Sequence, residues 1–181
     1  LPPVERDPEV WNGTIATGFN GGNGSKNDPY QIATAEQLAY LASSINVKNE
    51  NDSYVKKYSL TNGKYYKLTN DIYLNDFSSA TWYEASNNPR EWTFGTQAVA
   101  HTNESSFAGT LDGDGHTIYG LYISGEYEVA GLFIGLNNNA KITNLGMSKA
   151  YINSTSSKGA VGAFAGRRHG WAETGKKVTF D

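Results

Sequence analysis

Short apolar triplets alternate with turn-forming residues through the second half of the chain. Three apolar residues recur after about 24 positions: Ile118, Leu121 and Ile123 return as Ile142, Leu145 and Met147. The stretches between such triplets are rich in Gly, Asn and Asp, which favour turns. Because one short coil cannot bury its inward face alone, repeats of this kind are stable only when neighbouring coils stack. The pattern predicts a solenoid of short parallel strands.

A second repeated feature is a short apolar segment framed by glycines. Residues 131–135 read GLFIG, and residues 162–166 read GAFAG. Strand-like patterns also occur at Tyr65–Leu68 and at residues 72–74, with a turn between them. We therefore expect coils over residues 64–166.

The first part of the chain predicts a loop followed by one helix. Residues 11–30 are dense in Gly, Asn and Asp, which indicates repeated turns. Thr34 followed by Gln37 has the spacing of a capping box at a helix N-terminus. The following apolar residues have helical spacing and predict a helix that ends near Asn46: Leu38, Leu41, Ala42 and Ile45. Such a helix would cover the apolar end of the first coil.

These patterns divide the chain into three regions. Residues 1–63 are expected to form an N-terminal loop and a capping helix. Residues 64–166 are expected to form the coils, with an insertion at 75–106 that breaks the repeat. Residues 167–181 lose the pattern and are expected to be an irregular end, so that further domains of the same polypeptide would follow. The predicted fold class is mainly β, a parallel β-helix with one N-terminal capping α-helix.

Composition narrows the function classes. The chain has 181 residues, a net charge of −3 and no cysteine. The absence of a dense Lys or Arg segment argues against a nucleic-acid partner. Without cysteine there is no disulfide framework, thiolate metal site or Cys nucleophile. No apolar run reaches the roughly 18 residues that a membrane helix needs, so we do not expect membrane insertion.

The glycine-framed segments resemble the GLUG motif of bacterial cell-surface proteins. The residues that carry the resemblance are Gly131, Leu132, Phe133 and Gly135, and in a weaker second copy Gly162, Phe164 and Gly166. The second copy departs from the pattern because Ala163 stands where leucine is expected. The order of FAGTLDGDGHTIYGLYI, GLFIG and AKITNLGM is similar to one repeat of that family, and DPYQIATAEQLAYLA is similar to the capped entrance of large secreted bacterial β-helix proteins.

This resemblance implies a right-handed parallel β-helix in a secreted, adhesin-like bacterial surface protein. The motif is structural in that family and implies no catalytic residue, so we expect a noncatalytic stalk or adhesion module that binds a glycan or a host or matrix protein. One alternative is a carbohydrate-active β-helix enzyme or its accessory domain. Another is a noncatalytic region of a surface peptidase.

Two polar constellations could carry chemistry. Asp112, Asp114 and His116, with His101 nearby in sequence, are candidates for a divalent-ion site, but Asp-Gly-Asp-Gly also caps turns, which we favour. A glycosidase would need a pair of acids, and Asp71 and Asp76 join the two aspartates above as candidates. Each of these four aspartates lies in a segment of turn-forming residues, so we expect no catalytic residue and no metal site.

No cofactor is expected either. The run Asn137–Asn139 is interpreted as a turn, with calcium coordination through its carbonyl oxygens as the alternative.

The insertion holds the candidate ligand-binding residues. They are the aromatic residues Trp82, Tyr83, Trp92 and Phe94. Exposed aromatic faces stack on sugars and dominate protein contact sites. The alternative, which we favour slightly, is that these side chains pack the insertion onto the coils. Alternation also predicts that Tyr119, Tyr122 and Tyr127 face outward, where they could support the tyrosines of neighbouring coils.

Overall fold

A computed structural model describes residues 9–45, 61–97, 106–168 and 179–180. These residues form short strands, the helix α1 (Ala35–Ile45) and the 3₁₀ helices η2 (Ala85–Asn87) and η3 (Thr93–Gly95). The strands are β1 (Tyr30–Ile32), β2 (Tyr65–Leu68), β3 (Ile72–Tyr73), β4 (Thr96–Gln97), β5 (Thr110–Asp112), β6 (Thr117–Tyr119), β7 (Tyr122–Gly125), β8 (Val129–Ala130), β9 (Phe133–Leu136), β10 (Lys141–Thr143), β11 (Gly146–Ser148), β12 (Tyr151–Ser154), β13 (Ala160–Val161), β14 (Ala165–Arg168) and β15 (Thr179–Phe180).

Helix α1 begins where the capping residues predict. The backbone N–H of Gln37 donates to Thr34 Oγ1 at 3.4 Å. The Gln37 side chain accepts from the N–H of Ala33 at 2.7 Å, one residue earlier than in the usual capping box. The predicted end at Asn46 lies outside the described residues.

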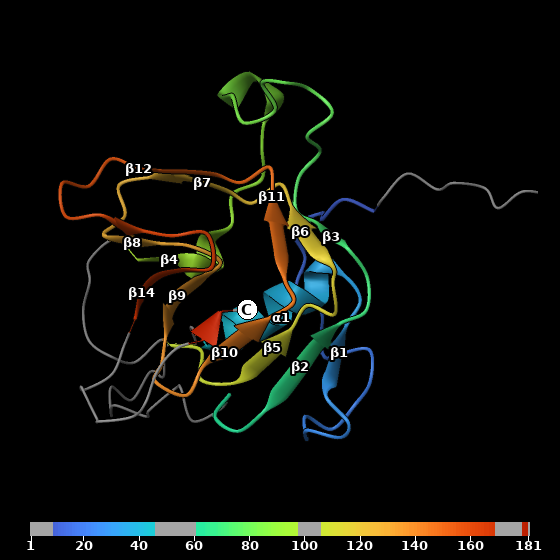
Figure 1. The fold of residues 1–181 in the computed structure, drawn as a ribbon. Coiled ribbons are helices and arrows are strands. Elements are labelled where there is room, and N and C mark those ends of the chain that lie inside the picture. The colour runs from blue at the N-terminus through green and yellow to red at the C-terminus, as the bar shows by residue number, and fades with distance from the viewer. Residues whose placement is uncertain (1–8, 46–60, 98–105, 169–178, 181) are drawn as a thin grey trace, which may run out of the picture.

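Strands from successive passes of the chain pair in parallel. The sheets have the orders β1-β2-β5-β10-β15, β11-β6-β3, β12-β7, β13-β8-β4 and β14-β9. All named strand pairs are parallel except β4 with β8, which is antiparallel. Figure 1 shows the strands at the periphery and α1 behind β5 and β10. The fold is therefore mainly β with one helix, and its parallel sheets are consistent with the expected β-helix.

The register between coils differs from the repeat read from the sequence. Ile118 pairs with Met147 rather than corresponding to Ile142, and Ile142 instead pairs with Leu111. Ile123 likewise pairs with Ile152. The 24-residue alignment was wrong because the inward triplets of different sheets share one apolar pattern, so a triplet can be aligned with that of the neighbouring sheet.

The core of the described residues combines inward-facing strand residues with one face of α1. Leu121, Ile118 and Phe133 are buried, which confirms their assignment to the interior. Phe107 and Phe133 stack with ring centroids 4.9 Å apart and planes 7° apart. The helix contributes its apolar stripe to the same cluster: Leu38, Leu41, Ala42 and Ile45. The helix thus buries its apolar stripe in the same core as the strands, and its role as a cap on the first coil stays a prediction.

The glycine-framed segments are places where backbones of neighbouring coils come close together. A Cβ on Gly131 would lie 2.5 Å from the carbonyl oxygen of Gly162. A Cβ on Gly95 would lie 1.6 Å from the carbonyl oxygen of Gly131. A side chain at either position would collide with the backbone of a neighbouring strand. Close backbone packing therefore explains why both positions are occupied by glycine. Leu132 and Phe133 between the motif glycines are buried, while Phe164 of the second copy is partly buried.

The end of the chain is more regular than the sequence indicates. Strand β14 reaches Arg168, and β15 pairs in parallel with β10, so that Phe180 lies beside Ile142. The expected irregular end, 167–181, therefore contains strand at both of its described parts. No helix in the described part of the chain is long and apolar enough to cross a membrane.

Candidate functional site

The predicted insertion divides into an excursion and a segment that joins the coils. Asn75 closes the base of the excursion: its Nδ2 donates to Arg90 O at 2.9 Å and to Gly120 O at 2.8 Å. Its Oδ1 accepts from the N–H of Arg90 at 2.6 Å. Beyond this clamp, the N–H of Trp92 donates to Tyr122 O at 2.8 Å, so the chain has already returned to the coils. Residues 92–97 of the predicted insertion thus lie against the neighbouring strands, and residues 98–105 lie outside the described residues.

Two of the four candidate ligand-binding aromatics, Trp92 and Phe94, belong to the core cluster or pack against it. Trp92 is fully buried, and its indole N–H donates to Leu132 O at 2.9 Å. Its ring packs edge-on against Trp11 at 5.4 Å and against Phe94 at 4.9 Å. A ligand at the surface cannot reach a fully buried ring. The interpretation of Trp92 as a ligand-binding residue is therefore wrong, and its side chain packs the interior. Phe94 is partly buried against the same core cluster.

The other two aromatics lie beside a stack of tyrosines on the coils. Tyr122 on β7 and Tyr151 on β12 are register partners, with centroids 5.5 Å apart and planes 12° apart. Tyr83 from the excursion stacks on Tyr151 at 4.6 Å and 5°. Trp82 is buried and contacts Tyr122 edge-on at 6.2 Å, whereas Tyr83 is exposed. Tyr83 is therefore the member of the predicted set that presents a large apolar side chain to solvent.

A second aromatic stack follows the neighbouring sheet. Tyr73 and Tyr119 stack at 5.0 Å and 7°, and Phe77 stacks on Tyr119 at 5.4 Å. Both tyrosines are half-buried, and desolvation raises the pKa of the Tyr73 phenol, with smaller contributions from Asp71 and Tyr119. Alternation predicted Tyr119 on the outward side. The stacked rings support neighbouring coils.

The Asp-Gly-Asp-Gly segment forms a turn held by its own side chains. Asp112 Oδ1 accepts from the N–H of Asp114 at 2.9 Å and from Asn144 Nδ2 at 3.0 Å. Asp114 has a positive φ of 52°. Its Oδ2 lies 2.8 Å from Lys67 Nζ, and the Asp114 carboxylate, through its hydrogen bond and its charge, raises the pKa of that amine. These contacts agree with the favoured interpretation of this segment as a turn, and they also connect it to β2 and to the residue after β10.

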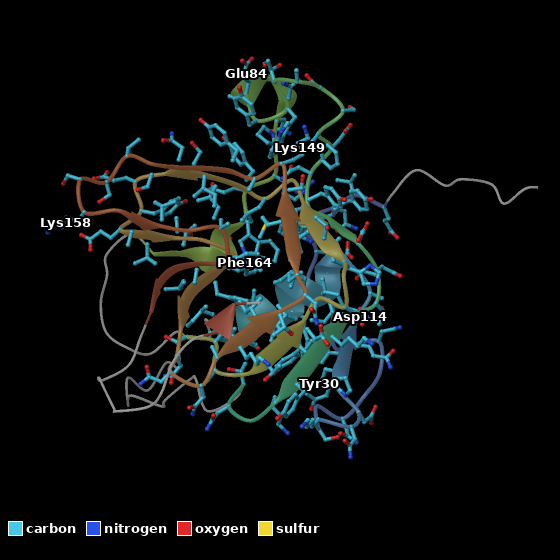
Figure 2. All side chains as sticks on the ribbon, in the orientation of Figure 1. Tyr30, Glu84, Asp114, Lys149, Lys158 and Phe164 are labelled. Carbon is cyan, nitrogen blue, oxygen red and sulfur yellow. The ribbon has the colours of Figure 1, made fainter. Side chains whose placement is uncertain are left out.

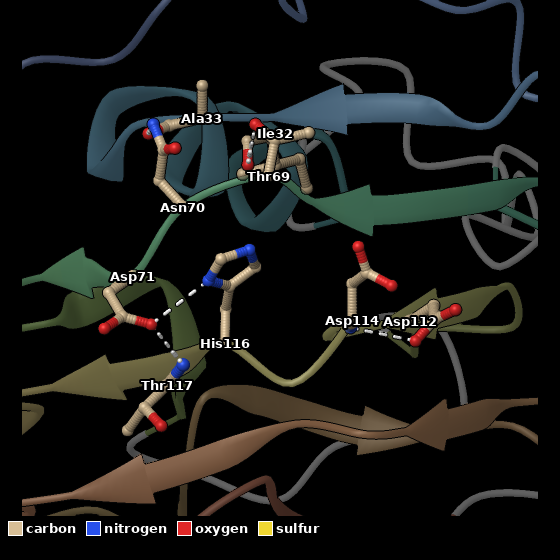
Figure 3. Close-up of polar contacts among 9 residues, drawn as sticks. All are labelled: Ile32, Ala33, Thr69, Asn70, Asp71, Asp112, Asp114, His116 and Thr117. Carbon is tan, nitrogen blue, oxygen red and sulfur yellow. Dashed lines mark hydrogen bonds and ion pairs between the residues drawn. The ribbon is translucent and has the colours of Figure 1, made fainter.

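His116 and Asp71 form a second contact of the same turn region (Figure 3). Asp71 Oδ1 lies 3.2 Å from His116 Nδ1 and accepts from the N–H of Thr117 at 2.9 Å. Asp76 Oδ1 accepts from the N–H of Ser78 at 2.9 Å, and this bond lowers the pKa of Asp76. All four candidate acids thus contact turn amides or basic side chains.

The described residues contain no group of three or more His, Cys, Asp or Glu side chains placed to hold a metal ion. His101 lies outside the described residues. Residues 137–140 form a turn in which the N–H of Ala140 donates to Asn137 O at 2.9 Å, as the first interpretation of Asn137–Asn139 predicted. Whether calcium binds there stays a prediction.

A polar cavity lies on the outer face of β2, β5 and β10. It has a volume of about 530 Å³, within the usual range for small-ligand sites. Its floor follows two register rows, Tyr65–Thr110–Lys141 and Lys67–Asp112–Thr143. Lys26, from the loop before β1, also lines it. We call this cavity the lysine groove.

The N-terminal loop is fixed beside the lysine groove by backbone contacts. The N–H of Tyr65 donates to Gly24 O at 3.0 Å, and Gly24 N–H bonds Asp28 O at 3.0 Å. Gly24 has a φ of 76°, and a Cβ there would lie 2.3 Å from the ring of Tyr30. The turn-rich sequence of residues 11–30 predicted a loop but not its position beside β2.

A second cavity of about 470 Å³ lies between this loop and α1. Phe19, Tyr30, Tyr40 and Tyr66 line it, with Phe19 stacked on Tyr30 at 4.7 Å. Burial, and then the neighbouring phenols of Tyr30 and Tyr40, raise the pKa of Tyr66 well above its ordinary value. Of these rings, Tyr66 belongs to the core cluster, and Phe19 and Tyr30 pack against it.

Sequence reasoning did not find the lysine groove. Lys26, Tyr65 and Lys141 lie in segments that the sequence predicts as loop or strand, and no local motif distinguishes them. They meet because β2, β5 and β10 are register partners. The usable signal was alternation: Tyr65, Lys67 and Lys141 flank buried residues and must face outward.

Comparison with known proteins gives two distant relatives. The chain is 30% identical over 160 residues to a halomucin of Haloquadratum walsbyi, an alignment that covers 87% of this chain and 2% of that protein. It is 30% identical over 155 residues to a protein named as a Gly-rich membrane protein of Evansella cellulosilytica, covering 84% of this chain and 15% of the relative. The chain thus spans a small part of each. No protein family model matches the chain, and no solved structure matches it.

Proposed function

We propose that this chain is a noncatalytic extracellular module of a larger cell-surface protein, built as part of a right-handed parallel β-helix and binding a glycan or a protein on the outside of its coils. The names of the two relatives, a halomucin and a Gly-rich membrane protein, support the surface location. The small share of each relative that the chain spans supports a place within a longer polypeptide. The GLUG-like segments support a bacterial, adhesin-like setting.

The lysine groove is the observation that carries the binding part of the proposal. It is concave, polar and large enough for a sugar unit, and its floor is a regular row of side chains on three paired strands. Tyr65 adds an aromatic ring to these polar groups. Side chains on paired strands are held more precisely than those on a loop, which favours recognition.

The acids support a noncatalytic role over a carbohydrate-active enzyme. A glycosidase needs one carboxylic acid and one carboxylate positioned on either side of the scissile bond. Asp112, the acid that lines the lysine groove, already accepts from Asp114 N–H and Asn144 Nδ2. Asp71 is occupied by Thr117 N–H and His116.

A glycan and matrix-protein array with the purified chain, run with and without calcium, tests the proposal. We expect specific retention that Tyr65→Ala weakens, because Tyr65 lines the lysine groove. Tyr83→Ala serves as a matched exposed-tyrosine control and should bind like the wild type. Loss of binding in Tyr83→Ala alone would show that the binding site lies on the excursion and not in the lysine groove. Absence of any retention on the array would overturn the binding proposal.

A further inference from the structure

The cavity between the N-terminal loop and α1 is lined by residues from the loop, β1, α1 and β2. Its described lining includes Phe19 of the loop, Tyr30 of β1, Tyr40 and Ser44 of α1 and Tyr66 of β2. Its volume of about 470 Å³ is within the usual range for small-ligand sites. Figure 2 shows Tyr30 on the side of the molecule that carries β1, away from Glu84 on the excursion. We call this cavity the tyrosine cavity.

Backbone hydrogen bonds hold the loop wall of the tyrosine cavity against β1. The N–H of Asn20 donates to Gln31 O at 3.0 Å, and the N–H of Gln31 donates to Gly21 O at 2.9 Å. Phe19 directly precedes Asn20, so this pairing fixes the segment that carries the Phe19 ring. A wall that is already in place lowers the cost of ordering the site when a ligand binds.

Tyr66 supplies the tyrosine cavity with a buried phenol. Tyr66 is 4% exposed, but its hydroxyl forms no hydrogen bond within the described part of the chain. Buried tyrosine hydroxyls usually have such a partner. Burial, and then the phenols of Tyr30 and Tyr40, raise the pKa of Tyr66, which indicates that the three hydroxyls lie near one another. All three residues line the tyrosine cavity, so an occupant with hydroxyl groups would complete their hydrogen bonding.

Phe19 joins the aromatic rings into one wall. Its ring stacks on Tyr30 at 4.7 Å and packs edge-on against Tyr40 at 5.1 Å and Tyr66 at 5.6 Å. Such a wall suits the C–H face of a sugar ring. A quaternary ammonium ion would instead need several open ring faces around it, and Phe19 already fills the space between these rings.

The polar groups of the tyrosine cavity are neutral. No described residue of its lining carries a charge. Ser44 Oγ donates to Leu41 O at 2.7 Å, which leaves the Ser44 oxygen able to accept a hydrogen bond. A purely apolar ligand would leave the buried Tyr66 hydroxyl unpaired, and an ionic ligand would meet no opposite charge on the described lining.

We propose that the tyrosine cavity binds a neutral sugar unit, with the sugar hydroxyls on the tyrosine and serine side chains and a C–H face against the aromatic wall. The site is separate from the lysine groove, which carries the binding part of the proposed function. Tyr66 lines both cavities, whereas Tyr30 and Tyr40 line the tyrosine cavity alone of the two, and Tyr65 lines the lysine groove alone. Variants at these positions therefore distinguish the two sites.

Saturation-transfer difference NMR with the full chain and a panel of neutral sugars tests the inference. The panel holds the methyl glycosides of glucose, galactose, mannose and N-acetylglucosamine. We expect saturation transfer to at least one of these sugars, strongest at the C–H protons of one ring face. Raising NaCl from about 50 to about 500 mM should leave the dissociation constant unchanged, because screening acts on charges. Absence of transfer to every sugar of the panel would overturn the inference.

Variants that remove single hydroxyls locate the site. Tyr40→Phe and Tyr66→Phe should each weaken binding by about two- to tenfold, the range expected for one neutral hydrogen bond. Tyr66→Phe should leave the melting temperature unchanged, because the lost hydroxyl has no partner in the described part of the chain. Tyr119→Phe is the matched control, since Tyr119 is a half-buried, stacked tyrosine on β6. Unchanged affinity in Tyr40→Phe and Tyr66→Phe, or an equal loss in Tyr119→Phe, would overturn the tyrosine cavity as the site.

Tyr65→Ala separates the inference from the proposed function. We expect this variant to bind the neutral sugar like the wild type. Loss of sugar binding in Tyr65→Ala, with normal binding in Tyr40→Phe, would place the sugar in the lysine groove. That result would overturn the inference and leave the proposed function intact. Sugar binding that depends on Tyr40 but not on Tyr65, without Tyr65-dependent retention on the array, would support the inference and overturn the lysine groove.

Discussion

Individual side chains in this protein divide sharply between the interior and the outer faces of the coils. Leu121 is fully buried, whereas its neighbour Tyr122 is half-buried and stacks on Tyr151. The same alternation separates buried Tyr66 from Tyr65 and Lys67 on β2. A substitution should therefore have an effect that depends on which of the two faces it changes.

Leu121→Asp tests the interior. A carboxylate buried without a partner should lower the free energy of unfolding by about 3–5 kcal/mol. Val161→Asp is the control, because Val161 is 47% exposed and the new carboxylate would stay hydrated. Urea denaturation of both variants checks the prediction. Equal midpoints for the two would refute the interior position of Leu121.

Trp92→Ala tests the corrected role of this tryptophan. Loss of a buried indole that also hydrogen-bonds Leu132 O should cost about 3–5 kcal/mol and lower the melting temperature clearly. Tyr83→Ala removes an exposed ring and should cost no more than about 1.5 kcal/mol through lost stacking. Differential scanning calorimetry distinguishes the two. An unchanged melting temperature for Trp92→Ala would show that the Trp92 side chain lies at the surface and not in the interior.

At the scale of elements, close backbone contact between coils depends on particular glycines. Gly131→Ala should destabilise the protein by about 1–3 kcal/mol, because the added methyl meets the carbonyl oxygen of Gly162. Gly18→Ala is the matched control, as nothing lies within 4 Å of a Cβ there. Thermal denaturation of both variants measures the difference. A neutral Gly131→Ala would mean that the coils can separate without loss of stability.

The ion pair that joins β2 to the Asp-Gly-Asp-Gly turn has a signature in pH. Asp114 raises the pKa of Lys67 above its ordinary value of 10.5. The pair therefore stabilises the fold fully below pH 10.5, and this contribution is lost as pH rises through the raised pKa. In Asp114→Asn, an NMR titration of the Lys67 side chain should return the pKa toward the ordinary value. An unchanged titration would exclude the ion pair.

The sequence predicted correctly those elements that depend on interactions between residues close together in the chain. Helix α1 was predictable because Thr34, Gln37 and the apolar stripe act within a few residues of one another. Strand β2 was placed correctly for the same reason. The register between coils was not predictable, because turn lengths between strands vary and each triplet can be aligned with several others.

At the scale of the whole molecule, stacking joins residues that are distant in sequence. Lys26, Lys67 and Lys141 come from three separate passes of the chain and line one cavity. No local pattern marks them as a group, so the candidate site could be recognised only once the parallel register was known. The prediction of an aromatic binding site was wrong for Trp92, because a residue outside the repeat pattern can still pack in the core. Trp92 lies in a segment that breaks the repeat, yet it returns to the core.

Simultaneous measurement of retention and cleavage on immobilised polysaccharides tests the central claim, a noncatalytic surface-binding module, most directly. The purified chain is incubated with acidic and neutral polysaccharides, and both bound protein and newly formed reducing ends or unsaturated products are followed over time. We predict retention of the protein without new chain ends. A time-dependent release of shortened saccharides, abolished in Asp112→Asn, would contradict the account and establish a carbohydrate-active enzyme.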